Sequence, residues 1–172
     1  MIKLICDKIA RVIKNRKKLE EALGLQIVNR GTEVYIKGAP EDEYVAEKVI
    51  EALDFGFPYS VAISLIDELY LFEIINIKSY SHKKDFARIR ARIIGKEGKT
   101  LKTLSGLTKC FFELKDNEVG IIGEAEYIKN AQYAIISLIQ GSKQANVYAY
   151  LEKHQIQPVF DLGLKEVKHK NL

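Results

Sequence analysis

The chain has 172 residues, of which 47% are hydrophobic and 29% charged, and its formal net charge is +4. A chain of this length and composition can bury a core, and it fits one domain or two small ones. Its longest apolar runs are too short to span a membrane and its N-terminus shows no secretory pattern, so we expect a cytoplasmic protein without a membrane partner.

An internal repeat organises the chain. The segment VYIKG at 34–38 is matched by VGIIG at 119–123, an offset of 85 positions. After each segment a stretch with helical periodicity leads to another glycine, Gly56 or Gly141. The two halves therefore look like one supersecondary unit used twice.

The first half is predicted to extend over residues 1–67. We expect the order strand, helix, loop, helix, strand, strand, helix between residues 1 and 53. Pro40 lies ahead of the last helix, near the position that proline favours at a helix start. A short extension helix is then predicted over residues 58–67.

The second half, predicted over residues 68–154, repeats this order with clearer signals. Strands are indicated by β-prone residues around a polar turn, and helices by apolar residues at helical spacing. The expected elements are a strand at 69–77, helices at 86–94 and 99–107, strands at 108–114 and 119–122, and a helix at 124–140. Gly106 is a plausible end for the second of these helices.

A second extension helix is predicted over residues 146–153, and residues 155–172 are assigned to a C-terminal tail. We expect the two extension helices to dock the halves against each other.

Two glycines lie three positions apart between the first two helices of the second half, in Gly95-Lys96-Glu97-Gly98. Because glycine lacks a Cβ, these positions can adopt the turn and let a ligand touch the backbone. The start of the following helix offers free N–H groups and a positive dipole end, which favour a phosphate. A G-x-x-G spacing is weak evidence by itself, since many occurrences are simply turns between helices.

Positive charge is concentrated in two segments. Residues 83–102 carry eight basic and two acidic residues, and residues 8–21 carry six basic and two acidic residues. The remainder of the chain is acidic. Clustered cations are typical of a surface that binds a polyanion, although a solvated helix face is the alternative for a lysine-rich run.

The order of elements around the loop resembles the type I K-homology (KH) domain, and IIGKEGKTL at 93–101 is similar to that family's signature. In KH domains this loop clamps about four nucleotides of single-stranded RNA. The resemblance implies an α+β fold of two tandem type I KH units (βααββα), each a three-stranded sheet with helices on one face and a short extra helix after it.

We expect the RNA to lie in a narrow groove beside the loop, with the strand at 111–113 as its opposite wall. The apolar residues expected to line part of this groove are Ile93, Ile94, Leu101 and Leu104. The predicted RNA-binding residues are Arg88, Arg90, Arg92, Ile93, Ile94, Gly95, Lys96, Glu97, Gly98, Lys99, Thr100, Leu101 and Lys102.

The first unit has Lys14-Asn15-Arg16-Lys17 where the glycines should be. Its backbone cannot come as close to a phosphate, so we expect no standard RNA clamp there. We expect the first unit either to keep a basic surface or to serve as a protein-binding platform. The second unit also has nine more residues before its loop, which include His82, Lys83 and Lys84 and predict a larger positive surface next to the motif.

The chain resembles the archaeal homologue of the Dim-two/Partner-of-Nob family of small-subunit ribosome assembly factors. The features that carry this resemblance are the pair of one degenerate and one intact loop, the segment RIRAR at 88–92 and the segment V-Y-x-x-L-E-K at 147–153. The resemblance covers residues 2–153. It implies binding of single-stranded RNA near the 3′ end of small-subunit ribosomal RNA, with the endonuclease that trims it and the alpha subunit of translation initiation factor two as partners. A related KH assembly factor that binds other RNA, and a KH scaffold that binds protein, are the alternatives.

No catalytic, metal or cofactor site is predicted. The acidic groups at 41–43 and 67–68 are joined by no histidine or nucleophile at a recognisable spacing, so we expect no enzyme. Cys6 and Cys110 are far apart and lie in apolar runs, as reduced and buried thiols do.

Overall fold

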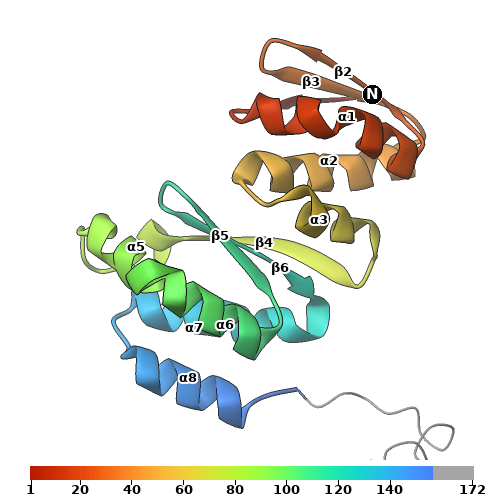
Figure 1. Cartoon of the computed structure of the whole chain (residues 1–172). Helices are drawn as coiled ribbons and strands as arrows, with labels where there is room; N and C mark the ends of the chain where they lie inside the picture. The colour runs from red at the N-terminus through yellow and green to blue at the C-terminus, as the bar shows by residue number, and fades with distance from the viewer. Residues whose placement is uncertain (157–172) are drawn as a thin grey trace, which may run out of the picture.

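Two three-stranded antiparallel sheets organise the chain (Figure 1). This computed structural model describes residues 1–156, so the predicted tail from residue 157 onward lies outside the described part. The fold is α+β, as predicted, and the last strand of each sheet lies in its middle, in the orders β1-β3-β2 and β4-β6-β5. The internal repeat of the sequence thus corresponds to two sheets of the same topology.

The first unit contains β1 (Ile2–Ile5), α1 (Ile9–Leu23), β2 (Gln26–Arg30), β3 (Glu33–Lys37) and α2 (Pro40–Phe55). Alternate strand residues such as Ile27, Val34 and Ile36 are fully buried beneath the helices. Pro40 occupies the first turn of α2, followed by three acidic residues that suit the positive end of the helix dipole.

The first unit has one helix where two were predicted. Helix α1 runs unbroken through residues 14–17, so the predicted loop there is wrong and the order of this unit is βαββα. Lysine and arginine are good helix formers, and Val12, Leu19 and Leu23 form one continuous buried stripe along α1. The helix ends only at Gly24, which adopts the left-handed conformation with φ 65°.

The second unit contains both helices around the loop. Its elements are β4 (Tyr70–Asn76), α4 (Ile77–Tyr80), α5 (Phe86–Ile94), the short 3-10 turn η2 (Lys96–Gly98), α6 (Lys99–Thr108), β5 (Phe111–Lys115), β6 (Glu118–Glu124), α7 (Ala125–Ile139) and α8 (Gln144–Lys153). Apart from the extra turn α4, this is the predicted βααββα order.

Helix α6 does not end at Gly106, as the sequence suggested, but continues to Thr108. Leu104 and Thr108, four positions apart on one face, are both buried. Burying that face outweighs the cost of about 1 kcal/mol that a glycine imposes inside a helix. Lys109 then ends the helix in the left-handed conformation, with φ 54°, and β5 begins later than predicted.

The sheet of the second unit is covered on both faces. Helices α5, α6 and α7 lie on one side and α2 on the other (Figure 1). Phe55 and Phe57, at the end of α2, pack against that second face. A Cβ on Gly120 would lie 2.7 Å from the Phe55 ring and 2.9 Å from the Phe57 ring, so the two phenylalanines rest directly on the β6 backbone. Phe72 of β4 packs edge-on against both rings, with centroids 5.8 and 5.7 Å away.

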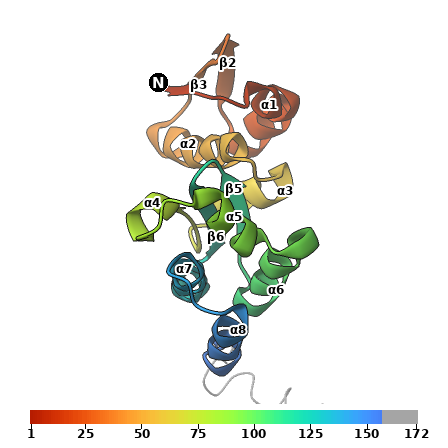
Figure 2. The same cartoon turned by 90° about the vertical axis from the view of Figure 1, so that its left-hand side faces the viewer.

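The two extension helices have different places. The first, α3 (Tyr59–Ala62) with the 3-10 helix η1 (Ile63–Ile66), packs between α2 and β4 and joins the units, as predicted. The second, α8, packs on α6 and α7 of its own unit (Figure 2), so the prediction that it docks the units is wrong. Within residues 1–156 no helix is long and apolar enough to cross a membrane.

Candidate RNA-binding site

The loop at 95–98 has an unusual backbone. Gly95 lies at φ 76° and ψ 174°, a region that essentially only glycine adopts. A Cβ there would also lie 2.1 Å from Thr100 Oγ1. Glu97 and Gly98 are left-handed as well, with φ 56° and 73°. Three of the four loop residues thus have positive φ, and at Glu97, the one with a Cβ, this conformation is strained. Such strain gathers at functional sites.

The start of α6 is left open for an anion. Gly98 is the N-cap residue and has no side chain with which to cap the first N–H groups. The side chains of Lys96 and Lys99 are exposed on either side. Free backbone N–H groups, the positive end of the helix dipole and two lysines can together hold the phosphate of a nucleic acid backbone.

Helix α8 braces the loop from behind. Gln144 Nε2 donates hydrogen bonds to the carbonyl of Arg92 at 3.1 Å and to Thr100 Oγ1 at 2.9 Å, so it ties the end of α5 to the start of α6. The Arg92 guanidinium donates to the carbonyls of Leu138 and Ser142, at 3.2 and 2.6 Å. Arg92 therefore positions the loop against the end of α7, rather than presenting a free charge to RNA.

Other predicted site residues also lie beneath the site. Arg90 donates to Asn117 Oδ1 in the turn between β5 and β6. Ile93 and Leu104 are completely buried, so the expectation that they line the groove is wrong: they form the floor on which the loop rests. Thr100 is only 4% exposed.

A groove of about 280 Å³ begins at Leu101, in the first turn of α6 after the loop. Leu101 and Lys102 of α6 lie along one side, and the strand β5 supplies the other, as predicted. The remaining lining was not predicted, because it comes from the first unit: Phe57, Pro58 and Val61. Their only signal in the sequence was the aromatic run FGFP at 55–58, which has the composition of a contact surface.

One groove residue, Phe111, suits an unstacked nucleotide. Phe111 is 44% exposed, an aromatic surface on which a base can stack. Glu113 is half-buried, and this burial raises the pKa of its carboxyl, although the nearby charges of Arg11 and Lys8 act in the opposite direction. Ile94, 38% exposed, adds apolar surface at the end of α5.

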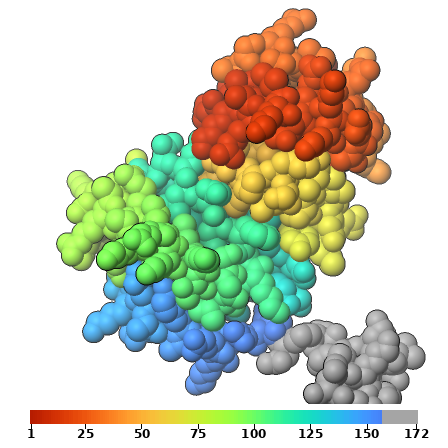
Figure 3. All heavy atoms as spheres, in the orientation of Figure 1, coloured from red at the N-terminus to blue at the C-terminus, as the bar shows by residue number. Residues whose placement is uncertain are grey.

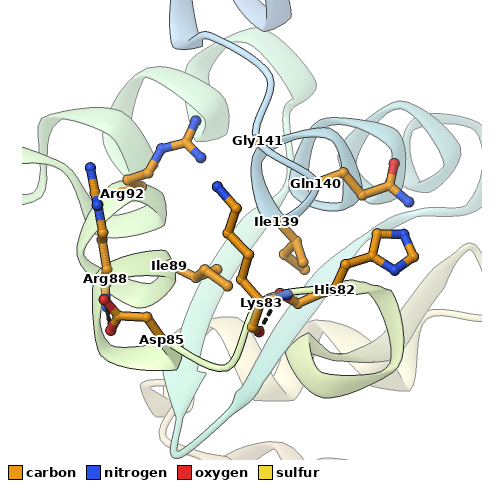
Figure 4. A pocket seen from close by; sticks show the side chains of 10 residues that line it. His82, Lys83, Asp85, Arg88, Ile89, Arg92, Ile139, Gln140 and Gly141 are labelled. Carbon is orange, nitrogen blue, oxygen red and sulfur yellow. Dashed lines mark hydrogen bonds between the residues drawn. The ribbon is translucent and has the colours of Figure 1, made fainter.

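A second hollow, the basic pocket, lies at the other end of α5 (Figure 4). Its volume is about 360 Å³, and it is bounded by residues 81–85, α5 and the end of α7. Arg88, Arg92 and Lys83 lie around it, and Asp85 caps α5 by accepting a hydrogen bond from the Arg88 backbone at 3.2 Å. Ile89 and Ile139 form an apolar floor.

The residues before α5 were expected next to the G-x-x-G loop. Instead, His82 and Lys83 lie at the N-terminal end of α5, whereas the loop follows its C-terminal end. Nine helical residues separate them, about 13 Å at 1.5 Å per residue. The positive charge of the residues before α5 thus adds to the basic pocket rather than to the loop.

No cluster of three or more histidine, cysteine or acidic residues within residues 1–156 could hold a metal ion. Cys6 and Cys110 are buried, and this burial raises the pKa of both thiols to about 11. At neutral pH they are protonated and inert.

Residues 71–156 match the family model of the second PNO1 KH domain, described as "Eukaryotic type KH-domain (KH-domain type I)". A KH domain-containing protein of Methanocaldococcus jannaschii is 28% identical over 166 residues, which is 90% of this chain and 73% of that protein. The Pre-rRNA-processing protein pno1 of Aspergillus oryzae is 35% identical over 111 residues, or 62% of this chain. The match spans only 43% of that fungal protein's length.

Two solved structures share the fold. Dim2p from Pyrococcus horikoshii OT3 superposes with a TM-score of 0.81 at 28% identity, over 89% of this chain and 98% of that one. A structure of the a/eIF2alpha-aDim2p-rRNA complex from the same organism contains a chain that matches with a TM-score of 0.82 at 28% identity, over 90% of this chain and 93% of that one.

Proposed function

Because this chain belongs to the type I KH family, in the branch of the second PNO1 KH domain, we propose that it is a non-catalytic protein that binds single-stranded RNA. Its ligand is small-subunit ribosomal RNA near the 3′ end, during ribosome assembly and pre-rRNA processing in the cytoplasm. The names of the Aspergillus relative, a pre-rRNA-processing protein, and of the Pyrococcus complex, which contains rRNA, support ribosomal RNA as the ligand.

One observation carries the proposal: the G-x-x-G loop is braced open beside an apolar groove. The brace by Gln144 and the left-handed backbone keep the N–H groups of α6 directed outward. The groove beside them offers Phe111 and Leu101 to the bases. Phosphate contacts on one side and base contacts on the other are how KH domains hold about four nucleotides.

The predicted site residues divide into two groups. Those that contact RNA through exposed side chains or the loop backbone are Arg88, Ile94, Gly95, Lys96, Glu97, Gly98, Lys99, Leu101 and Lys102. Those that position them from beneath are Arg90, Arg92, Ile93 and Thr100.

We further propose that residues 1–67 are a KH-derived unit whose helix is no longer broken, and that residues 68–154 form the standard RNA-binding unit. The matching strand orders of the two sheets support the common origin. The alpha subunit of translation initiation factor two and an rRNA-processing endonuclease are the proposed protein partners. The first of these is named in the Pyrococcus complex.

The test exploits two equivalent glycines. Gly98 and Gly24 are both left-handed, with φ 73° and 65°, and a Cβ at either meets no atom within 4 Å. Gly98→Asp and Gly24→Asp therefore carry similar strain and the same added charge, but only the first places a carboxylate where the phosphate should lie. Binding of a labelled 3′ segment of small-subunit rRNA is measured for both variants and for the wild type, at two salt concentrations.

We expect salt-dependent binding by the wild type and by Gly24→Asp, and a loss of more than about a hundredfold with Gly98→Asp. Equal binding by the two variants would show that the loop is not the site. An unrelated RNA of the same length, bound as tightly as the rRNA segment, would argue for a KH factor of other specificity. No binding of either RNA by the wild type would favour the protein scaffold.

A further inference from the structure

We propose that the outer face of the first sheet is a docking site for a partner protein, which covers it with a helix that carries an acidic side chain beside apolar ones. This face, here called the open face, lies opposite α1 and α2. It goes beyond the proposed function, because the protein should bind this partner without RNA. The open face is formed by every second residue of β1, β2 and β3, which are Lys3, Ile5, Gln26, Val28, Arg30, Glu33, Tyr35 and Lys37, together with Met1.

Apolar side chains are exposed on the open face. A hollow of about 310 Å³ lies on it, and Met1, Val28 and Tyr35 line this hollow together with polar residues of β2 and β3. Ile5, at the end of β1, is 72% exposed. In Figures 1 and 3, β2 and β3 lie at the end of the molecule farthest from the second unit, beyond α1 and α2. Apolar surface rimmed by polar residues marks protein interaction sites.

The second sheet shows what covers this face in the same fold. The offset of 85 positions between the units makes Tyr35 the counterpart of Gly120, and both lie on the central strand of their sheet. The face around Gly120 is covered by the end of α2, where Phe55 and Phe57 rest on β6. Within residues 1–156 no helix covers the corresponding face of the first sheet. A partner protein can supply the missing cover.

The repeat also predicts the charge of that partner. The same offset relates Arg30 to Lys115, and each occupies the same register position beside the central strand. Lys115 Nζ lies 3.0 Å from Asp7 Oδ2 and 3.3 Å from Asp54 Oδ2, both of which belong to the unit that covers the second sheet. Within residues 1–156 Arg30 forms no ion pair. A covering helix should therefore bring a carboxylate to Arg30, as α2 brings Asp54 to Lys115.

The open face has the dimensions of one helix. Three strands about 4.8 Å apart and five residues of about 3.4 Å each give a face of about 14 by 17 Å. A helix with its side chains is about 10 Å across. A single helix thus covers most of the open face, as α2 lies over the second sheet in Figure 1.

An aromatic residue among cations can also bind RNA, but this ring is already engaged. Lys3 Nζ and Arg30 Cζ lie 5.8 and 5.9 Å from the centre of the Tyr35 ring. The Tyr35 hydroxyl donates a hydrogen bond to Glu33 Oε2 at 2.6 Å, and Lys3 Nζ lies 2.5 Å from Glu33 Oε1. A base that stacks on the ring must displace these cations, and the carboxylate of Glu33 repels a phosphate. The open face therefore favours protein over RNA.

The experiment selects binders without presuming which protein they come from. A phage-displayed library of helical peptides, randomised along one face, is selected on the RNA-free wild type and, in parallel, on Arg30→Glu. Fluorescence anisotropy then gives the affinity of the wild-type peptides for Val28→Lys, and photocrosslinking with mass spectrometry locates them on the protein. Tyr44→Lys is the matched control, because Tyr44 is 56% exposed, close to the 54% of Val28, but lies on α2.

We expect peptides selected on the wild type to carry aspartate or glutamate beside apolar residues, and those selected on Arg30→Glu to carry lysine or arginine instead. Val28→Lys should bind the wild-type peptides at least about tenfold more weakly, because it places a charge in the hollow. Tyr44→Lys should bind them normally, and their crosslinks should fall on β1, β2 and β3. Lysine is common on exposed edge strands, so circular dichroism should show Val28→Lys to be folded.

Peptides without acidic residues, or with equal affinity for Val28→Lys and the wild type, would overturn the inference. Crosslinks of a photoreactive single-stranded RNA to β1, β2 and β3 would make the open face an RNA surface instead. A dimer in sedimentation velocity that Val28→Lys dissociates would assign it to a second copy of this chain. Failure of the proposed function is distinct, because Gly98→Asp would then bind RNA like the wild type while the peptide affinities stay unchanged.

Discussion

The two units build the same three-stranded sheet but cover it differently. In the first unit a single helix, α1, spans the place where the second unit has α5, a strained loop and α6. The sheet orders and antiparallel pairings are the same. The fold is therefore compatible with either arrangement, and the break at residues 95–98 is not needed for packing. A strained feature that the fold does not need is best explained by its ligand.

The two sheets also differ in how far the face opposite their own helices is exposed to solvent. The second sheet is enclosed between its own helices and Phe55 and Phe57, whereas the outer face of the first sheet is open and carries Val28, 54% exposed, beside Tyr35. The sheet of the unit with the G-x-x-G loop is thus packed on both faces. Rigid support is what a preorganised binding site requires.

The largest expected effect is on RNA binding. Arg88→Glu/Lys96→Glu, at exposed positions of the second unit, should weaken binding of an RNA of about twelve nucleotides by more than a hundredfold, because it places two negative charges along the phosphate path. Lys14→Glu/Lys17→Glu in the first unit should cost less, about tenfold. Fluorescence anisotropy at constant salt gives both values.

The same charge is reversed in both variants, so each is the control for the other. The opposite ranking would mean that the first unit, not the second, holds the clamp. Arg90 and Arg92 are left unchanged because their hydrogen bonds support the structure.

The second comparison concerns the thiols, one in each core. Because burial raises the pKa of Cys6 and Cys110 to about 11, the folded protein at pH 8 should react with iodoacetamide at least about a hundredfold more slowly than the unfolded chain. Between the ordinary thiol pKa and about 11, the unfolded chain loses protons that the folded one keeps. The free energy of unfolding should therefore fall as pH rises through that window.

Single-cysteine variants, Cys6→Ala and Cys110→Ala, report each unit separately. We expect equal labelling rates, since the contact of Phe55 and Phe57 with Gly120 couples the cores. Much faster labelling of Cys6 would show that the first unit opens alone.

The sequence was most informative where the signal is local. We could locate α5, the loop and α6 from the helical spacing and the two glycines, because a backbone conformation that only glycine adopts requires glycine at that position. The prediction from the sequence was wrong at residues 14–17, where the match to the second unit suggested a loop although the residues themselves favour a helix. The wall formed by Phe57 and Pro58 was also missed, because contacts between residues far apart in the chain have no local pattern.

Glycine alone should not recreate the clamp in the first unit. Lys14→Gly/Lys17→Gly should lower the free energy of unfolding by about 2 kcal/mol, near 1 for each helix interior glycine, without increasing RNA affinity. The reason is that, within residues 1–156, no side chain of another element forms a hydrogen bond with residues 14–17 of α1, whereas Gln144 joins the end of α5 to the start of α6. Urea unfolding and RNA titration measure the two effects.

Gly106→Ala in α6 is the matched control, since Gly106 is an exposed helical glycine with no atom near its Cβ position. It should stabilise the protein by about 1 kcal/mol. A gain in RNA affinity by the double glycine variant would mean that the loop sequence, rather than its support, makes the clamp.

The smallest expected effect is at the boundary between the units. Lys115 Nζ lies 3.0 Å from Asp7 Oδ2 and 3.3 Å from Asp54 Oδ2, both in the first unit. Although burial disfavours its charge, the hydrogen bonds and charges of these two carboxylates raise the pKa of Lys115 overall. Lys115→Gln should therefore lower the free energy of unfolding by about 1 kcal/mol, whereas Lys3→Gln, which breaks a more exposed ion pair within the first sheet, should produce no measurable change.

The difference between the two variants should disappear as pH rises through the raised pKa of Lys115, because the wild type then loses the same charge. Equal effects of the two variants in urea unfolding at pH 7 would mean that the bridge between the units contributes nothing beyond an ordinary surface pair.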